Sequence, residues 1–295
     1  MRYFISKVMN FAGKVIDFKM PEVMGILNVT PDSFSDGGEL LLASGKPATD
    51  KIMKRAESMH EAGAAFIDIG GESTRPGANK ISDEEEMERV LPLVEKISKN
   101  IDVVVSVDTS SPALMQEAAK AGAGLINDVR ALQRPGAVEI VSKINLPVCL
   151  MHMQGEPATM QQAPSYNQLL DEILEFLKHR IAVCTKAGID RQQIIVDPGF
   201  GFGKTLEHNL ELLGRLGEFK SLKLPLLIGL SRKGMLGLIT GKSPKERQAA
   251  GVTAAVIGLM QGADIIRTHD VAETVDAVKV YTAVKSNELK HHLRN

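Results

Sequence analysis

The sequence has few of the residues that mark several classes of protein. It has no Trp and only 3 Tyr and 9 Phe among 295 residues, so an aromatic platform that stacks single-stranded nucleic acid is not expected. Its 35 Lys and Arg are balanced by 36 Asp and Glu, a net charge of −1, which argues against a general nucleic-acid surface. Because 44% of the residues are hydrophobic, the chain is expected to fold rather than remain disordered.

Cysteine and long apolar runs are also scarce. The two cysteines, Cys149 and Cys184, form no Cys-x-x-Cys pair and show no zinc-ligand spacing with His. We expect both to be buried free thiols, which fits a reducing compartment. No apolar run approaches the roughly 20 residues of a membrane span, and residues 1–18 lack a signal-peptide core. The sequence therefore predicts a cytoplasmic protein with no nucleic-acid or membrane partner.

Short apolar runs alternate with longer amphipathic stretches along the chain. We predict strands at eight of these runs, namely 23–28, 66–70, 103–108, 125–128, 147–152, 194–198, 225–231 and 264–268. Several are apolar at nearly every position, as strands buried on both faces are. Signals for helix starts lie between the runs. The expected caps are Ser82, Ser111, Ser243 and Asp270.

Strands that alternate with helices predict an α/β fold. Eight such strands favour a single (β/α)₈ barrel over residues 22–285. An open, doubly wound parallel sheet is the alternative that the pattern leaves. Residues 1–21 precede the barrel and are expected to form a short N-terminal β-hairpin, and residues 286–295 form a tail.

A polar side chain stands at the end of every predicted strand, where barrels build their active sites. Asp108, Asn127 and Asp197 supply carboxylates and an amide, which suit a flat polar heterocycle. Cations instead stand at the ends of the last two strands, where barrels frequently bind phosphate; they are Arg232, Lys233, Arg267 and His269. Asn28 and Asp108 can support a Mg²⁺ ion that is held mainly by phosphate and water.

Residues 199–205 combine three glycines with a lysine, as phosphate-binding loops do. They do not match the P-loop motif, because Pro198 stands where its first glycine is required. We expect a flexible loop that carries Phe202 to the rim of the barrel, with Thr205 capping the next helix.

The stretches that follow the strands resemble the bacterial dihydropteroate synthases. The matching stretches include 24–38 (MGILNVTPDSFSDGG), 68–78 (DIGGESTRPGA), 197–205 (DPGFGFGKT) and 229–237 (GLSRKGMLG). Members of this pterin-binding family are TIM barrels and usually homodimers. The resemblance implies a transferase of folate biosynthesis that is a sulfonamide target. It would condense 6-hydroxymethyl-7,8-dihydropterin diphosphate with p-aminobenzoate and release diphosphate, with Mg²⁺ as cofactor.

The resemblance also implies a role for each matching residue. The expected pterin-binding residues are Asp108, Asn127, Asp197 and Lys233, with Asp108, Asp197 and Lys233 also catalytic, and Asn28 is the expected Mg²⁺ contact. The expected diphosphate-binding residues are Thr74, Arg75, Arg267 and His269. The expected p-aminobenzoate pocket consists of Phe34, Pro76, Phe202, Ser231 and Arg232. Gly234 departs from the family, since many relatives carry a larger residue there, and this puts the flexibility of its loop in question.

Three other functions stay open from the sequence. A pterin-dependent methyltransferase shares the barrel and the pterin contacts but needs no cations for a diphosphate. A barrel aldolase would use Lys233 to form a Schiff base, and a non-catalytic sensor of pterin or phosphate would keep the fold without the activity. Residues 252–263, rich in Ala and Gly, are expected to pack either on a second copy of the chain or on the barrel wall.

Overall fold

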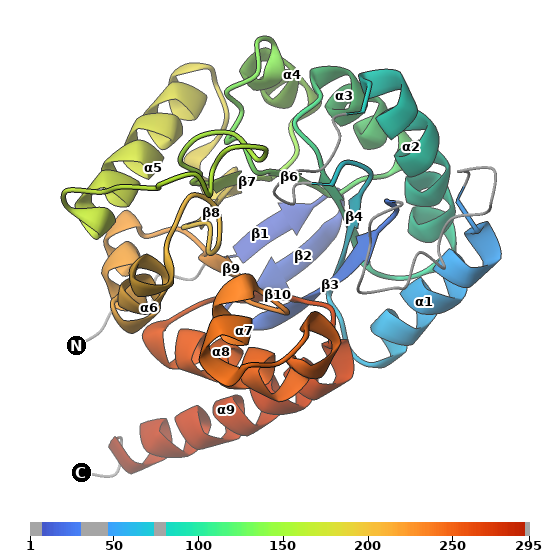
Figure 1. Ribbon diagram of the computed structural model, residues 1–295. Helices are drawn as coiled ribbons and strands as arrows, with labels where there is room; N and C mark the ends of the chain where they lie inside the picture. The colour runs from blue at the N-terminus through green and yellow to red at the C-terminus, as the bar shows by residue number, and fades with distance from the viewer. Residues whose placement is uncertain (1–7, 31–46, 74–80, 293–295) are drawn as a thin grey trace.

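The computed structural model describes residues 8–30, 47–73 and 81–292. Within them, eight parallel strands form one sheet with helices arranged around it (Figure 1). The strands are β3 (Glu22–Asn28), β4 (Phe66–Gly70), β5 (Val104–Asp108), β6 (Leu125–Asp128), β7 (Val148–Met151), β8 (Ile194–Asp197), β9 (Leu227–Gly229) and β10 (Ile265–Thr268). Each of the predicted strands is present.

The sheet closes into a barrel at β8 and β9. Neighbouring strands follow the order β8-β7-β6-β5-β4-β3-β10-β9. A parallel bridge between Val196 of β8 and Leu226, just before β9, joins the two edges. The backbone N–H of Val196 also donates to the carbonyl of Pro225 across this seam. The architecture is therefore the predicted (β/α)₈ barrel and not an open sheet.

Helices lie on the outside of the barrel, between consecutive strands and after the last strand. They are α1 (Thr49–Glu61), α2 (Asp83–Asn100), α3 (Pro112–Ala121), α4 (Ala137–Ile144), α5 (Leu169–Lys186), α6 (Leu206–Gly214), α7 (Gly234–Thr240), α8 (Gln248–Gln261) and α9 (Val271–His292). No helix in the described part of the chain is long and apolar enough to cross a membrane. Helix α9 continues through residues 286–292, so it crosses the expected boundary between barrel and tail.

The predicted helix starts are largely reproduced. Ser82 accepts the N–H of Glu85 at the start of α2, and Ser111 accepts that of Leu114 at the start of α3. Thr205 caps α6 by accepting the N–H of His208. The signal at Ser243 instead starts a short 3₁₀ helix, η3 (Pro244–Glu246), and α8 begins separately after it.

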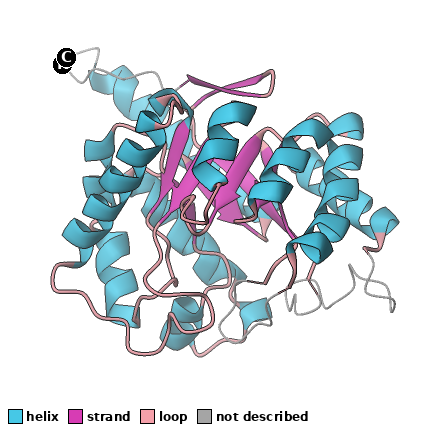
Figure 2. Cartoon of the chain, turned by 90° about the horizontal axis from the view of Figure 1, so that it is seen from above, coloured by secondary structure: helices cyan, strands magenta, loops and turns pink. Residues whose placement is uncertain are grey.

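An antiparallel hairpin of β1 (Val8–Phe11) and β2 (Lys14–Asp17) covers one end of the barrel. Figure 2 shows it at the top, with long loops at the opposite end. Phe11 is buried edge-on against Phe66 of β4, with ring centroids 5.0 Å apart, and also contacts Phe18. Aromatic burial of this kind stabilises a core. The hairpin therefore closes the amino-terminal end of the strands and leaves the carboxyl ends for a site.

Candidate active site

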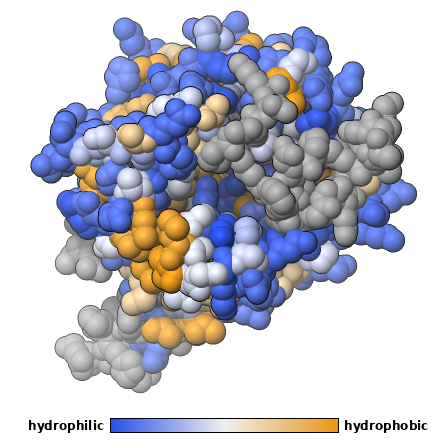
Figure 3. Space-filling view, viewed as in Figure 1, coloured by the Kyte–Doolittle hydropathy of each residue, from blue (hydrophilic) through white to orange (hydrophobic). Residues whose placement is uncertain are grey.

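Four positions lie side by side at the carboxyl ends of adjacent strands. Asn28 pairs with Gly70, Gly70 pairs with Asp108, and Asp108 pairs with Asn127 across β3, β4, β5 and β6. This register explains why polar residues far apart in the sequence meet at one end of the barrel. Figure 3 shows a recess with hydrophilic residues near the middle of the face seen in Figure 1.

Arg267 on β10 reaches across this end and joins two carboxylates. Its Nε donates to Asp68 Oδ2 over 2.6 Å, and its Nη2 donates to Asp108 Oδ2 over 2.8 Å. Asp68 is fully buried and also accepts from Asn127 Nδ2 (3.1 Å) and from Ser106 Oγ (2.5 Å). One arginine and one buried carboxylate therefore fix the positions of two predicted pterin-binding residues.

Burial sets the protonation of the two predicted catalytic carboxyl groups. It raises the pKa of Asp108 to about 7, although the charge of Arg267 opposes the rise. It raises the pKa of Asp197 to about 6, against the hydrogen bond from Gly199 and the charge of Lys233. Burial lowers the pKa of Arg267, but Asp68 and Asp108 outweigh this effect and its pKa is raised. The site therefore holds a permanent cation beside carboxyl groups that titrate near neutral pH.

The loop after β8 brings Asp197 and Lys233 into one environment. The Gly199 N–H donates to Asp197 Oδ1 over 2.7 Å, and the Lys233 ammonium lies 4.2 Å from the centre of the Phe202 ring. This is the distance of a cation–π contact. Burial, with help from Arg267, lowers the pKa of Lys233 to about 8.

Ser231, Arg232 and His269 are held by one another and by Asp270. Asp270 accepts from Arg232 Nη2 over 2.7 Å, and Ser231 Oγ lies 3.1 Å from His269 Nδ1. Arg232 has φ +58°, a left-handed conformation that is unusual for a residue other than glycine. The carbonyls of Arg232 and Lys233 accept hydrogen bonds from the Arg247 guanidinium. This loop is consequently braced from both sides.

The remaining site predictions are only partly covered by the described residues. Phe34, Thr74, Arg75 and Pro76 lie outside the described residues. Asp128, the last residue of β6, accepts the N–H groups of Arg130 and Leu132 and so organises its own turn. Gly234 is the exposed first residue of α7, and a Cβ there would meet nothing within 4 Å. Nothing in the structure requires glycine at that position.

Sequence reasoning assigned no role to Asp68 or Lys204. Asp68 lies two residues before Gly70 on β4, so its inward direction follows from strand alternation. That signal was readable in the sequence, but its link to Arg267 depends on contacts between strands 199 residues apart. Lys204 is almost completely buried, with 3% of its surface exposed. A lysine in a glycine-rich segment gives no sign of such burial.

Asn28 and Asp108 offer oxygen ligands beside a glycine. A Cβ on Gly70 would lie 3.3 Å from Asn28 Oδ1 and 3.7 Å from Asp108 Oδ2, so the glycine keeps a space open between them. In the described part of the chain, no group of three or more His, Cys, Asp and Glu side chains is placed to hold a metal. The arrangement fits a Mg²⁺ ion with few protein ligands and does not fit a protein-enclosed metal site.

Comparison with known proteins identifies the family. Residues 24–269 match the family model described as "Pterin binding enzyme". The chain is 52% identical to dihydropteroate synthase of Escherichia coli (strain K12) over 274 residues, which cover 93% of this chain and 95% of that protein. The chain belongs to the dihydropteroate synthase family. It is also 41% identical to the family member of Bacillus subtilis over 271 residues, 92% of this chain and 90% of that protein.

Solved structures of dihydropteroate synthases share the fold. The enzyme of Yersinia pestis in a sulfonamide drug complex matches with a TM-score of 0.91 and 50% identity, over 95% of this chain and 99% of that chain. The enzyme of Xanthomonas albilineans with 4-aminobenzoic acid matches with a TM-score of 0.87 and 43% identity, over 95% of this chain and 98% of that chain. The family match therefore extends over nearly the whole barrel.

A further carboxyl group, Glu86 of α2, is buried behind the site. Its Oε1 has no hydrogen-bond partner, and its Cγ would lie 3.1 Å from a Cβ on Gly71. Burial raises its pKa to about 8, and the charges of Glu72, Asp108 and Asp83 raise it further against a hydrogen bond with Thr109. Glu86 is therefore protonated in the folded protein at neutral pH.

We expect this carboxyl group to make the protein less stable as the pH rises. The folded state binds its proton up to about pH 8, whereas the unfolded state loses it near the usual glutamate pKa of 4.5, so stability falls across this range. Glu86→Gln should flatten the fall, measured as the free energy of unfolding in urea at pH 5, 6, 7 and 8. Glu88→Gln, at an exposed position of the same helix, should keep the wild-type slope. An unchanged slope in Glu86→Gln would contradict the assignment.

Proposed function

We propose that this protein carries out the dihydropteroate synthase reaction. It is a transferase of folate biosynthesis that condenses 6-hydroxymethyl-7,8-dihydropterin diphosphate with p-aminobenzoate and yields 7,8-dihydropteroate and diphosphate. The observation that carries the proposal is the division of the site into two chemical halves. Carboxyl and amide groups close β5, β6 and β8, whereas cations stand at the ends of β9 and β10, and the relatives that share this barrel are named for this activity. A methyltransferase, an aldolase or a sensor finds no support among these relatives.

Asp108, Asn127, Asp197 and Lys233 form the pterin-binding group in this proposal. A carboxylate can accept two parallel N–H bonds from the amino-pyrimidinone edge of a pterin. When the C–O bond to diphosphate breaks, the electron pair leaves with the diphosphate and positive charge spreads into the pterin ring. Asp108 and Asp197, ionised above about pH 7 and 6, would stabilise this charge. No covalent enzyme nucleophile is required.

His269 and Arg267 are proposed to act at the diphosphate, together with Thr74 and Arg75. The guanidinium of Arg267 already pairs with the carboxylates of Asp68 and Asp108. How strongly it would attract the diphosphate therefore depends on whether these two carboxyl groups are protonated. Support comes from position, since barrels often bind phosphate after their last two strands. Asn28 would hold a Mg²⁺ ion beside Gly70, and the ion would neutralise charge on the diphosphate.

The p-aminobenzoate pocket is proposed to contain Phe202, Ser231 and Arg232, with Phe34 and Pro76. The amine nitrogen attacks the pterin carbon, forms the new C–N bond and loses a proton. Phe202 is supported as a wall of this pocket because its ring lies against Lys233. A sulfonamide drug is bound in the Yersinia pestis structure, and we propose that sulfonamides compete for this pocket here too.

Asp197→Asn is expected to lower kcat by about 100-fold, because it removes a negative charge from the site where positive charge develops. The measurement is release of diphosphate and formation of dihydropteroate, each with and without p-aminobenzoate. The wild-type protein should form the two products in equal amounts only when both substrates are present. Removal of Mg²⁺ with EDTA should slow the reaction, and added Mg²⁺ should restore it.

Asp171→Asn is the matched control, because Asp171 is exposed on α5. It should keep wild-type activity. Absence of dihydropteroate with the wild-type protein would overturn the proposed function. Turnover by Asp197→Asn within twofold of wild type would overturn only the role of Asp197.

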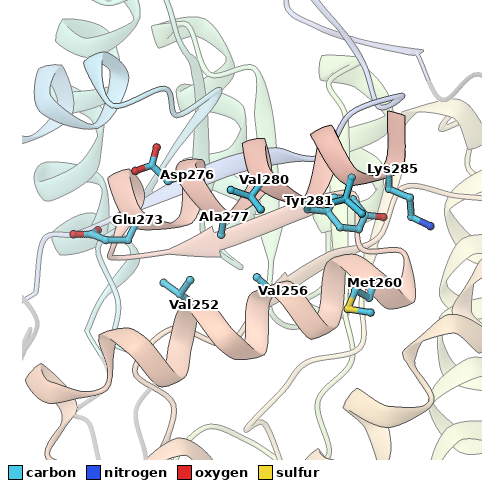
Figure 4. A pocket seen from close by; sticks show the side chains of 10 residues that line it. Val252, Val256, Met260, Glu273, Asp276, Ala277, Val280, Tyr281 and Lys285 are labelled. Carbon is cyan, nitrogen blue, oxygen red and sulfur yellow. The ribbon is translucent and has the colours of Figure 1, made fainter. Parts of the chain in front are cut away.

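We also propose a homodimer that forms through α8 and α9. The small residues of α8 pack on the barrel, since a Cβ on Gly258 would lie 2.2 Å from Ile228 Cδ1. Its opposite side faces α9 across an apolar groove of about 520 Å³ (Figure 4). Met260, Val280 and Val284 in this groove are 69%, 66% and 55% exposed. Exposed apolar patches of this kind mark protein interfaces, and a second copy of the chain can cover this one.

Met260→Glu should shift the protein from dimer to monomer, because a charge in an apolar interface loses its hydration without a partner. Sedimentation equilibrium or light scattering measures the mass. Val15→Glu changes a residue of the hairpin that is 66% exposed and should leave the mass unchanged. A monomeric wild-type protein, or a dimeric Met260→Glu variant, would contradict this interface.

Finally, we propose that the protein acts in the cytoplasm. Cys149 and Cys184 are both free and buried, and burial raises the pKa of each thiol. Unpaired, protonated thiols suit a reducing compartment.

A further inference from the structure

Lys204 is a buried lysine whose ammonium group is surrounded by acceptors from the protein. It follows the loop after β8 and is 3% exposed. Nζ lies 2.9 Å from the carbonyl oxygen of Gly199, 3.1 Å from that of Phe202 and 3.0 Å from His152 Nδ1. An ammonium group has three hydrogens, so these acceptors can use all of them. The side chain is therefore placed to hold protein atoms together.

The His152 ring that contacts Lys204 is held in one protonation state. Burial and the charge of Lys204 lower the pKa of His152 to about 2, so the ring is neutral. Its Nδ1 can then accept the hydrogen bond from Lys204, with the proton on Nε2. The ring also packs edge-on against Phe176, with centroids 5.0 Å apart. His152 thus ties Lys204 to the wall of the barrel.

Burial of this lysine is unfavourable in itself. It lowers the pKa of Lys204 to about 7, despite the opposing charge of Asp197. Neutral acceptors do not compensate a buried charge as a carboxylate would. An apolar side chain would avoid that cost, so stability alone does not explain a lysine here.

The glycine-rich loop that Lys204 contacts loses much conformational entropy when it becomes ordered. Gly199, Gly201 and Gly203 have φ values of +72°, +77° and +63°, so the unfolded segment has a large conformational entropy to lose. Gly199 and Gly203 approach the backbone of the segment after β7 closely. A Cβ on them would lie 1.9 Å from the carbonyl oxygen of His152 and 2.4 Å from that of Gln154. Lys204 Nζ donates hydrogen bonds to two carbonyl groups of this loop, those of Gly199 and Phe202.

Both of these loop residues, Gly199 and Phe202, contact residues of the site. Gly199 donates to the carboxylate of Asp197 over 2.7 Å, and the Phe202 ring lies 4.2 Å from Lys233 Nζ. A Cβ on Gly201 would also lie 3.2 Å from Lys233 Cδ. Displacement of the loop would therefore move the aromatic wall and the lysine that it contacts.

We propose that Lys204 is a positioning residue that holds Phe202 in place for the aromatic amine substrate. This inference rests on the proposed function. Lys204 contacts no substrate in this account, because its three donors are used within the protein. Its loss should therefore affect binding of p-aminobenzoate more than binding of the pterin diphosphate, because Asp108, Asn127 and Asp197 are placed by the strands β5, β6 and β8 themselves and not by this loop.

Lys204→Met tests the proposal by removing the donors at similar side-chain length. We expect KM for p-aminobenzoate to rise about tenfold, as misplacement of a positioning group by a fraction of an ångström does, and KM for the pterin diphosphate to change less than twofold. In the background of Phe202→Ala, Lys204→Met should add little to this rise, because both changes act on one wall. Lys178→Met, at an exposed position of α5, should leave both KM values unchanged.

The outcomes separate this inference from the proposed function. A wild-type protein without activity would refute the function, whereas an active wild type with equal changes in both KM values for Lys204→Met would refute only the role of Lys204. If Lys204→Met shows no cooperative thermal unfolding, Lys204→Arg decides. Arg keeps the charge but cannot place its planar donors on the same acceptors. It must then show the same selective rise, and its absence would overturn the proposal.

Discussion

The contact of Arg267 with Asp68 and Asp108 is the interaction on which the rest of the site depends. Arg267 comes from β10 and the two carboxylates come from β4 and β5, so this contact spans the carboxyl end of the barrel. Buried ion pairs contribute little to stability, because desolvation offsets their attraction. Their value here is geometric, since the planar guanidinium fixes two carboxylates at once. Asn127 is held on the same Asp68 oxygen.

The same contact governs the electrostatics of the site. Arg267 holds down the pKa of Asp108 and lowers that of Lys233. Burial brings the carboxyl groups of Asp108 and Asp197 and the ammonium group of Lys233 near their neutral forms at pH 7, and Arg267 opposes this effect on the carboxyl groups and adds to it on Lys233. Groups in this range can respond to the charges that develop on the pterin and on the departing diphosphate. The net charge of −1 for the whole sequence conceals this internal separation of acid and base.

Much of the fold was predictable, because each strand is a short apolar run and each connection carries helix signals. The rim residues Asp108, Asn127 and Asp197 were predictable from their place at strand ends, and the family motifs gave the chemistry. The contact between Val196 and Leu226 that closes the barrel has no signal of its own in the sequence. Closure could be predicted only because eight strands are the number that a barrel of this type contains. The roles of Asp68 and Lys204 were not predictable, since each depends on burial and on partners brought by distant segments. Asp128 shows that a carboxylate at a strand end can have a local role, because it accepts backbone N–H groups of the turn that follows it.

A double-mutant cycle on Asp68 and Arg267 tests the central claim most directly. The measurement is kcat/KM for the pterin diphosphate in wild type, Asp68→Asn, Arg267→Lys and the double variant. If Asp68 acts by holding Arg267, each single change should lower kcat/KM by about 100-fold or more, and the double variant should be little worse than the poorer single one. Asp68→Asn with near wild-type kcat/KM, or losses that simply multiply, would contradict the account.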